Sequence, residues 1–202
     1  MFRPSVDKLI EVIKAKGYAL YDTPGIDWNL NIVGIRALDP ELGKFNDTLT
    51  VFQRFRGIWE IYYYHITTDP SIYYLTHPVN SSGAAILKEG QYKGAYQMDI
   101  HNRGRISGHL ALCQRLGSVT VYRDSNRDAK LNLKAEKTET GMFSINIHRT
   151  TDRYANEQKF SAGCQVFADQ RQFNDFILKC KEGKKAFGNK FTYTLLHEKD
   201  FA

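Results

Sequence analysis

Residues 57–66 read Gly57-Ile-Trp-Glu-Ile-Tyr-Tyr-Tyr-His-Ile66, and this stretch is typical of a β-strand. Its β-branched and aromatic residues fit the pleated, half-buried surface of a sheet. Similar short runs of Val, Ile, Tyr, Phe and Thr, separated by Gly, Pro, Asn and Asp, continue from residue 29 to about residue 147. The sequence therefore predicts a strand-rich core, with strands at 30–36, 49–52, 57–66, 72–75, 96–100, 118–123, 130–133, 143–148 and 191–196.

Two helices are predicted on either side of this strand-rich region. Ser5 can cap the first helix, whose apolar residues follow helical spacing and which Gly17 ends. The second helix begins near Asp169, which forms a capping-box-like pair with Gln172, and it ends at Gly183. Its apolar stripe consists of Phe173, Phe176, Ile177 and Cys180.

Length and composition restrict the class of protein. The chain has 202 residues and a net charge of +6, and 42% of its residues are hydrophobic. This amount of apolar material excludes an intrinsically disordered chain, and the length suits one domain at roughly 100–200 residues per domain. We expect a single β-rich α+β domain over residues 1–202, with the first helix and its lead-in at 1–28 and the β-rich body at 29–202.

The sequence also bears on the compartment. No stretch approaches the roughly 20 apolar residues that cross a bilayer. Charged residues stand near the N-terminus, where a signal peptide has its apolar core. We therefore expect synthesis in the cytoplasm without a signal peptide and no insertion into a membrane. Cys113, Cys164 and Cys180 are odd in number and lack Cys-x-x-Cys spacing, which argues against a disulfide framework and a zinc ribbon.

Residues able to carry chemistry concentrate between positions 141 and 167. The segment Ser144-Ile-Asn-Ile-His148 is followed, after a polar stretch, by Ser161-Ala-Gly-Cys164. In a strand, Ser144, Asn146 and His148 share one face, and the apolar residues between them anchor the other face in the core. A histidine at the end of such a polar face is held rigidly, as a general base requires.

Cys164 follows a glycine, and a thiol in such a tight turn can be exposed. A nearby histidine or helix N-terminus lowers the pKa of a cysteine below about 8.5. Gly163 permits unusual backbone angles, so the N–H groups of Gly163 and Cys164 are candidate donors to an oxyanion. Cys164 and His148 are thus a candidate nucleophile and base, and the sequence leaves open that both are structural residues.

This order of a strand ending in Ile-His, a polar loop, Ser-x-Gly-Cys and a helix resembles the active-site signature of the YkuD-type L,D-transpeptidase family over residues 141–167. Upstream segments such as 31–36 and 83–96 are similar to a phage and bacterial branch of YkuD-like proteins. The resemblance implies the L,D-transpeptidase catalytic fold, with Cys164 as the nucleophile and His148 as the base. It also implies that Ser161 and Gly163 shape the loop and the oxyanion hole.

Two positions depart from the family pattern. Ala162 replaces a histidine, and Gln165 with the valine after it replaces an apolar residue followed by Arg or Asn. Arg149 or Arg153 can supply the lost charge, because a guanidinium clamps a carboxylate through two hydrogen bonds. Both arginines also fit a solvated loop. Asn146 either holds the histidine two residues later through its amide or satisfies strand ends.

These features predict acyl transfer through a Cys164 thioester on peptidoglycan stem peptides. An amine acceptor makes the chain a transpeptidase and water makes it an endolysin-like peptidase, and the motif leaves both open. Since peptidoglycan lies outside the membrane, a chain without an export signal is expected to be phage-associated, reaching the wall after lysis or on a virion. The alternative, which Ala162 and Gln165 favour, is a non-catalytic wall-binding or virion module that keeps the fold. Nucleic acid is not expected as a partner because the charge excess is modest.

The other histidines and cysteines have structural interpretations. His101 and His109 flank the basic segment 102–108, and we expect an exposed loop there, with access to the candidate site as the alternative. The remaining histidines show no metal-ligand spacing, so neither a metal nor another cofactor is expected. Cys113 and Cys180 are predicted to lie in the core.

Overall fold

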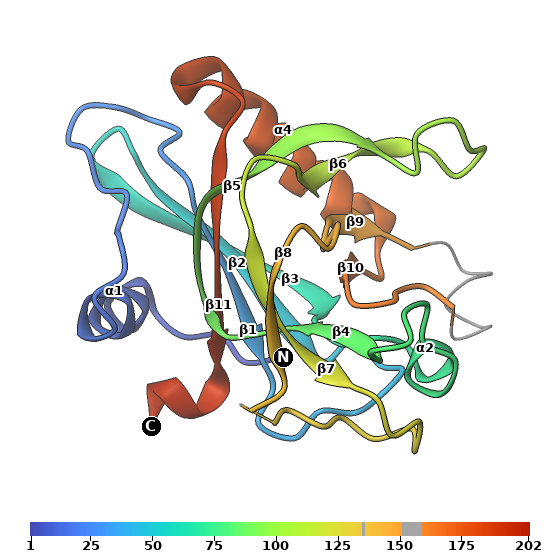
Figure 1. The fold of residues 1–202 in the computed structure, drawn as a ribbon. Coiled ribbons are helices and arrows are strands. Elements are labelled where there is room, and N and C mark those ends of the chain that lie inside the picture. Colours follow the sequence, from blue (N-terminus) through green and yellow to red (C-terminus); the bar gives the residue numbers. More distant parts are fainter. Residues whose placement is uncertain (135, 151–158) are drawn as a thin grey trace.

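The computed structural model of the chain describes residues 1–134, 136–150 and 159–202 (Figure 1). Strands dominate these residues, and the predicted mixed α+β class is confirmed. Eight strands close into a barrel in the order β1-β11-β5-β6-β9-β10-β3-β2, and a smaller sheet has the order β4-β7-β8. The strands are β1 Asn31–Arg36, β2 Asp47–Phe55, β3 Ile58–Thr67, β4 Ala84–Leu87, β5 Gly90–His101, β6 His109–Gln114, β7 Val119–Asp124, β8 Thr138–Gly141, β9 Ile147–Arg149, β10 Gln165–Phe167 and β11 Phe191–His197. The helices are α1 Val6–Ala15, α2 Ile72–Thr76, α4 Gln170–Phe187 and the 3-10 helix η1 Glu198–Phe201.

The longest hairpin of the barrel explains why residues 57–66 form a strand. β2 and β3 pair in antiparallel register from Asp47 opposite Ile66 to Phe55 opposite Ile58. The two residues between the strands have positive φ angles, 50° at Arg56 and 82° in the glycine after it. This is the conformation of a type I′ turn, whose twist matches that of the strands.

The barrel closes where short parallel strands meet. β1 pairs in parallel with β11, and β9 pairs in parallel with β10. β10 then pairs with β3 and β9 with β6. The segment that ends at His148 and the loop that carries Cys164 are separated in the sequence, but they belong to the neighbouring strands β9 and β10 or lead directly into them.

Two helices cover the barrel. The apolar face of α1 packs on a group of outward-facing residues, Val33, Ile35, Phe52 and Leu196. α4 lies beside β3, β9 and β10 (Figure 1) and contributes Phe173, Phe176 and Cys180 to the main core. The predicted core positions of Cys113 and Cys180 are confirmed, since neither side chain is exposed, and all three cysteines are free.

The predicted helix starts are confirmed, and one predicted helix end is wrong. The Ser5 side chain accepts a hydrogen bond from the backbone of Lys8, and the Asp169 side chain accepts from Gln172 N. The Gln172 side chain does not complete a capping box, because it accepts from the backbone of β3 instead. α4 continues through Gly183 to Phe187, since Gly183 is buried against Leu30 and its missing side chain lets the helix approach.

Two predicted strands are absent. Residues 72–75 form the single turn of α2, because Leu75 must reach the cluster of Ala84, Ile86 and Tyr122 and the tertiary contact outweighs local β propensity. Residues 130–133 form no strand. Their backbone is held instead by Asp124, whose side chain accepts from Asn132 N at 3.0 Å.

The predicted strand at 143–148 is shortened to β9. Ser144 has a φ angle of 58°, which interrupts an extended backbone. The alternation that would place Ser144 on one face with Asn146 and His148 therefore does not extend to Ser144. Only the last part of the segment pairs with its neighbours.

A buried arginine joins the barrel to the smaller sheet. Arg36 donates to Thr68 Oγ1 at 3.1 Å and to the carbonyl of Leu87 at 3.0 Å, and it forms ion pairs with Asp69 and Glu89. Burial raises the pKa of Asp69 to about 7. No helix of the described residues is long and apolar enough to span a membrane.

Candidate functional site

The loop before β10 seats Cys164 in a fixed conformation. The Ser161 hydroxyl accepts from Gly163 N at 3.0 Å and donates to the carbonyl of Cys164 at 2.9 Å. The Ser161 carbonyl accepts in turn from the backbone N of Ser71, at the start of α2, at 2.9 Å. Gly163 has a φ angle of 136°, and a Cβ there would lie 2.0 Å from the carbonyl oxygen of Ala85. Position 163 thus requires glycine, and the loop is held between Ser71 and Ala85.

The thiol of Cys164 is half-buried and held by the segment that leads into β9. Asn146 N donates to Cys164 Sγ at 3.3 Å, and the thiol donates to the carbonyl of Ser144 at 3.4 Å. Burial raises the pKa of the Cys164 thiol to about 11, against the opposing effect of the Asn146 hydrogen bond. The resting group is a neutral thiol. Ser144, whose carbonyl accepts from the thiol, has a φ angle of 58° that residues with a side chain rarely adopt, and such strain clusters at functional sites.

Three histidines form a cluster beside β9. The ring of His148 stacks on that of His101, with centroids 4.0 Å apart and planes 12° apart. The ring of His109 lies 5.3 Å from His101 and 5.9 Å from His148, and Phe173 of α4 covers it edge-on. Burial and the neighbouring histidines lower the pKa of His148 well below its usual value and that of His101 to about 4. All three rings are neutral at pH 7.

The hydrogen bonds determine which ring nitrogens carry protons. The backbone N of Gln114 donates to Asn146 Oδ1 at 2.9 Å, so the Asn146 amide NH₂ faces His101 Nδ1 at 3.0 Å. His101 Nδ1 is therefore an acceptor, and its proton is on Nε2. His148 Nδ1 donates to the carbonyl of Arg149 at 2.8 Å. This leaves His148 Nε2 unprotonated and able to accept a proton.

Asn146 links the thiol to the histidine cluster. In the parallel pairing of β9 and β10, Val166 lies opposite His148, so Cys164 lies two positions back, beside Asn146. The described residues contain no hydrogen bond between Cys164 Sγ and the His148 ring, the contact that direct activation requires. The connection runs through Asn146, whose backbone holds the sulfur and whose side chain holds His101. Hydrogen bonds between catalytic groups are often long without substrate.

Several predicted roles change in the structure. The expected loop around His101 and His109 is wrong for these two residues, which pair with each other in β5 and β6 and are half-buried. The amide of Asn146 bonds to His101 and not to His148, whose Nδ1 is bound to the carbonyl of Arg149. The N–H of Gly163 is bound to the Ser161 hydroxyl, so of the two predicted oxyanion donors only the N–H of Cys164 stays a candidate.

The predicted arginines have different outcomes. Arg149 is half-buried beside the cluster, with its backbone N 3.5 Å from His109 Nε2. Arg153 lies outside the described residues. For His101 and His109 the sequence favoured an exposed loop, and the alternative, a position near the candidate site, is the one that the structure shows. The available signal was their spacing, since two histidines that flank a short Gly-containing turn lie opposite each other in a hairpin.

A cavity adjoins the Cys164 loop. It has a volume of about 330 Å³, and Ala162 of the loop lines it together with Tyr74, Asn80 and Arg123. The Arg123 guanidinium lies 5.0 Å from the ring centroid of Phe143 and pairs with Glu139. The cavity thus leaves open space beside the loop at Ala162. No cluster of His, Cys, Asp and Glu in the described residues is arranged to hold a metal ion.

Comparisons with protein-family models, with curated proteins and with solved structures found no match to this chain. The chemistry of the site must therefore be inferred from the geometry of its own residues. Its essential parts are a close-packed loop that carries a thiol, a backbone N–H that donates to the sulfur, and a neutral histidine cluster in which His148 Nε2 can accept a proton.

Proposed function

We propose that this chain is a cysteine-dependent acyl-transfer enzyme that acts on peptidoglycan stem peptides, with a fold related to the catalytic domain of the L,D-transpeptidases. The observation that supports the reaction type is the seat of Cys164 beside Asn146, which connects the thiol to three neutral histidines. The wall substrate rests on the resemblance of residues 141–167 to the YkuD-type signature.

In the proposed reaction, a peptide carbonyl of the stem enters beside the Cys164 loop. His148 Nε2 accepts the proton of the thiol as the sulfur bonds to the carbonyl carbon. The N–H of Cys164 donates to the oxygen that becomes negative. His148 then returns the proton to the leaving amine, the C–N bond breaks and a thioester remains. An amine or a water molecule then attacks the thioester carbonyl, the C–S bond breaks, and the proton of the attacking group passes through His148 to the Cys164 sulfur.

The raised pKa of Cys164 makes substrate binding part of this mechanism. A thiol with a pKa of about 11 is almost entirely protonated at pH 7. The three neutral histidines carry no positive charge that would stabilise a thiolate in the resting protein. In the proposed mechanism the proton therefore moves only when a bound substrate brings the imidazole within reach of the sulfur, in the same step in which the sulfur bonds to the carbonyl carbon.

The expected place of action is the bacterial wall, reached from a phage by lysis or on a virion. The net charge of +6 favours approach to an anionic wall. The half-buried Arg149, next to His148, is the proposed partner of a substrate carboxylate.

A digest of purified sacculi, read by muropeptide chromatography, tests the catalytic proposal. We expect wild type to release or rearrange stem peptides and Cys164→Ala to reduce the rate at least about a thousandfold. His148→Gln should reduce it comparably, whereas the exposed His77→Gln serves as a matched control and should digest like wild type. Equal activity of wild type and Cys164→Ala would remove the catalytic role.

A second candidate function is a non-catalytic wall-binding or virion module. The absence of a Cys164–His148 hydrogen bond and the raised pKa of Cys164 favour it. Alkylation by iodoacetamide, followed by peptide mass spectrometry, separates the two functions. An enzyme should show faster modification at Cys164 than at the buried Cys113 and Cys180, and the Cys164 rate should rise when a stem peptide is present. A binding module should retain sacculi, digest nothing and show no such rise.

A further inference from the structure

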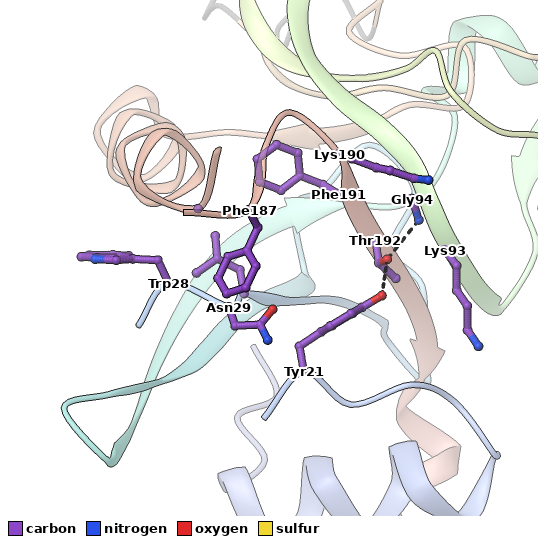
Figure 2. A pocket seen from close by; sticks show the side chains of 11 residues that line it. Tyr21, Trp28, Asn29, Lys93, Gly94, Phe187, Lys190, Phe191 and Thr192 are labelled. Carbon is purple, nitrogen blue, oxygen red and sulfur yellow. Dashed lines mark hydrogen bonds between the residues drawn. The ribbon is translucent and has the colours of Figure 1, made fainter. Parts of the chain in front are cut away.

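We propose that a second cavity, at the C-terminal end of α4, binds an anionic saccharide. The cavity has a volume of about 430 Å³, within the range of sites for small molecules. It lies between the lead-in to β1, the end of α4 and strands β5 and β11 (Figure 2). This inference extends the proposed function, because it concerns how a wall-active protein would hold its polymer.

Two lysines make the cavity a site for an anion. Lys93 and Lys190 both line it and are both exposed. Neither ammonium has an ion-pair or hydrogen-bond partner among the described residues, and no carboxylate lines the cavity. Gly94 makes room for the Lys190 side chain, since a Cβ on Gly94 would lie 2.2 Å from Lys190 Cε. The positive charge is therefore available to a ligand.

A pair of hydroxyl groups adds an unused donor. Tyr21 and Thr192 share one hydrogen bond of 2.6 Å, and Thr192 Oγ1 also accepts from Gly94 N at 3.0 Å (Figure 2). Two hydroxyl protons are present and the shared bond uses one of them. Whichever group donates, the other keeps a proton that no described protein atom accepts. The polar side of the cavity thus offers donors and cations, which suit a ligand rich in oxygen acceptors.

Aromatic rings form the other side. Phe187 is 43% exposed at the end of α4, and its ring lies near Asn29, across from the ring of Tyr21 (Figure 2). Phe191 also lines the cavity. A saccharide ring has apolar C–H faces that pack on aromatic rings and hydroxyl edges that take up hydrogen bonds. A sugar that carries a carboxylate or a phosphate would use both sides of this cavity.

The chain keeps unfavourable local structure around this cavity. Trp28 has a φ angle of 68°, which is rare for a bulky residue. Gly183 stands inside α4, where glycine costs roughly 1 kcal/mol relative to alanine. A Cβ on Gly183 would lie 3.3 Å from the Trp28 carbonyl, so the two features together set the distance between the helix and the lead-in. Strain of this kind is typical of ligand sites.

The cavity is separate from the candidate active site. His109 contacts α4 at Phe173, whereas Phe187 lines the cavity at the other end of the helix. Fourteen residues at about 1.5 Å of rise each place the two about 21 Å apart along the helix axis. A saccharide held here would anchor the protein while a stem peptide occupies the Cys164 loop.

An NMR titration of the full chain tests the proposal with three probes: N-acetylmuramic acid, glucose 6-phosphate and the neutral N-acetylglucosamine. We expect at least one anionic sugar to shift the amide signals of Gly94 and Thr192. The neutral sugar should bind at least tenfold more weakly. The anionic probe that binds distinguishes a carboxylate-bearing from a phosphate-bearing polymer. The proposal is overturned if no anionic sugar shifts these signals at millimolar concentration, or if the neutral sugar binds equally well.

Substitutions of exposed residues test the site and provide a control. The double variant Lys93→Gln with Lys190→Gln should raise Kd for the anionic sugar at least tenfold, and Phe187→Ala should also weaken binding. Lys181→Gln removes another exposed positive charge, on α4 but outside the cavity, and should bind like wild type. Unchanged binding by the double variant contradicts the site. Cys164→Ala should bind the sugar normally, so loss of the catalytic proposal would leave this site standing, and loss of sugar binding would leave the catalytic proposal untouched.

Discussion

The substitution Gly163→Ala should displace the loop that carries Cys164 and destabilise the fold. The φ angle of 136° at Gly163 is one that residues with a side chain rarely adopt. The added Cβ would lie 2.0 Å from the carbonyl oxygen of Ala85, which belongs to the backbone of β4 and cannot rotate away. Either the loop or the edge of the smaller sheet has to move.

Two contributions set the magnitude. A backbone held in a sparsely populated region costs on the order of 1–3 kcal/mol, and overpacking a buried position typically costs about 1–3 kcal/mol. We therefore expect the free energy of unfolding to fall by about 2–6 kcal/mol. At about 2–4 °C per kcal/mol for a chain of this size, Tm should fall by at least about 4 °C.

Gly141→Ala is the matched control, because Gly141 lies near the same site, has no positive φ angle and would place its Cβ 3.5 Å from the Phe143 ring. Urea denaturation should show Gly163→Ala strongly destabilised and Gly141→Ala little changed. Iodoacetamide should also modify Cys164 faster in Gly163→Ala, since the sulfur loses its bond from Asn146. Ordinary surface substitutions change the free energy of unfolding by up to about 0.5 kcal/mol. If Gly163→Ala changes it by no more than that, the reasoning that this position requires glycine is refuted.

Two further predictions concern pH. Burial lowers the pKa of His101 to about 4, so its ring signals in an NMR titration should move near pH 4. An unfolded histidine binds a proton near pH 6.5, so the stability that the neutral ring contributes is lost as pH falls from about 6.5 toward 4. Titration of His101 near pH 6.5 would contradict the buried cluster. The pKa of Asp69 is raised to about 7 by burial, so its contribution to stability is lost as pH rises from about 4 to about 7. Asp69→Asn should therefore lose less stability than wild type between pH 5 and pH 8 in urea denaturation, and parallel losses in the two proteins would show that this carboxyl is ionised throughout.

Much of the secondary structure was predictable because it depends on neighbours in the sequence. Ser5 and Asp169 cap helices through bonds to residues two or three positions later, and the β-branched and aromatic composition of residues 57–66 suits a strand. The choice of Cys164 and His148 as candidate residues also came from the sequence. The expected contact between the Cys164 sulfur and the His148 ring is not formed, because the register of β9 and β10 places Asn146 beside the sulfur.

Other features depend on contacts between distant residues. Residues 72–75 have strand-like composition but form a helical turn, because Leu75 fills a cluster built from β4 and β7. His101 and His109 join His148 only because β6 pairs with β9 when the barrel closes. Local sequence determines the caps, turns and alternation of this protein, since these involve bonds within a few residues. Tertiary structure alone decides the histidine cluster, the charge state of its rings and the environment of the thiol, because burial and strand register are properties of the closed sheet.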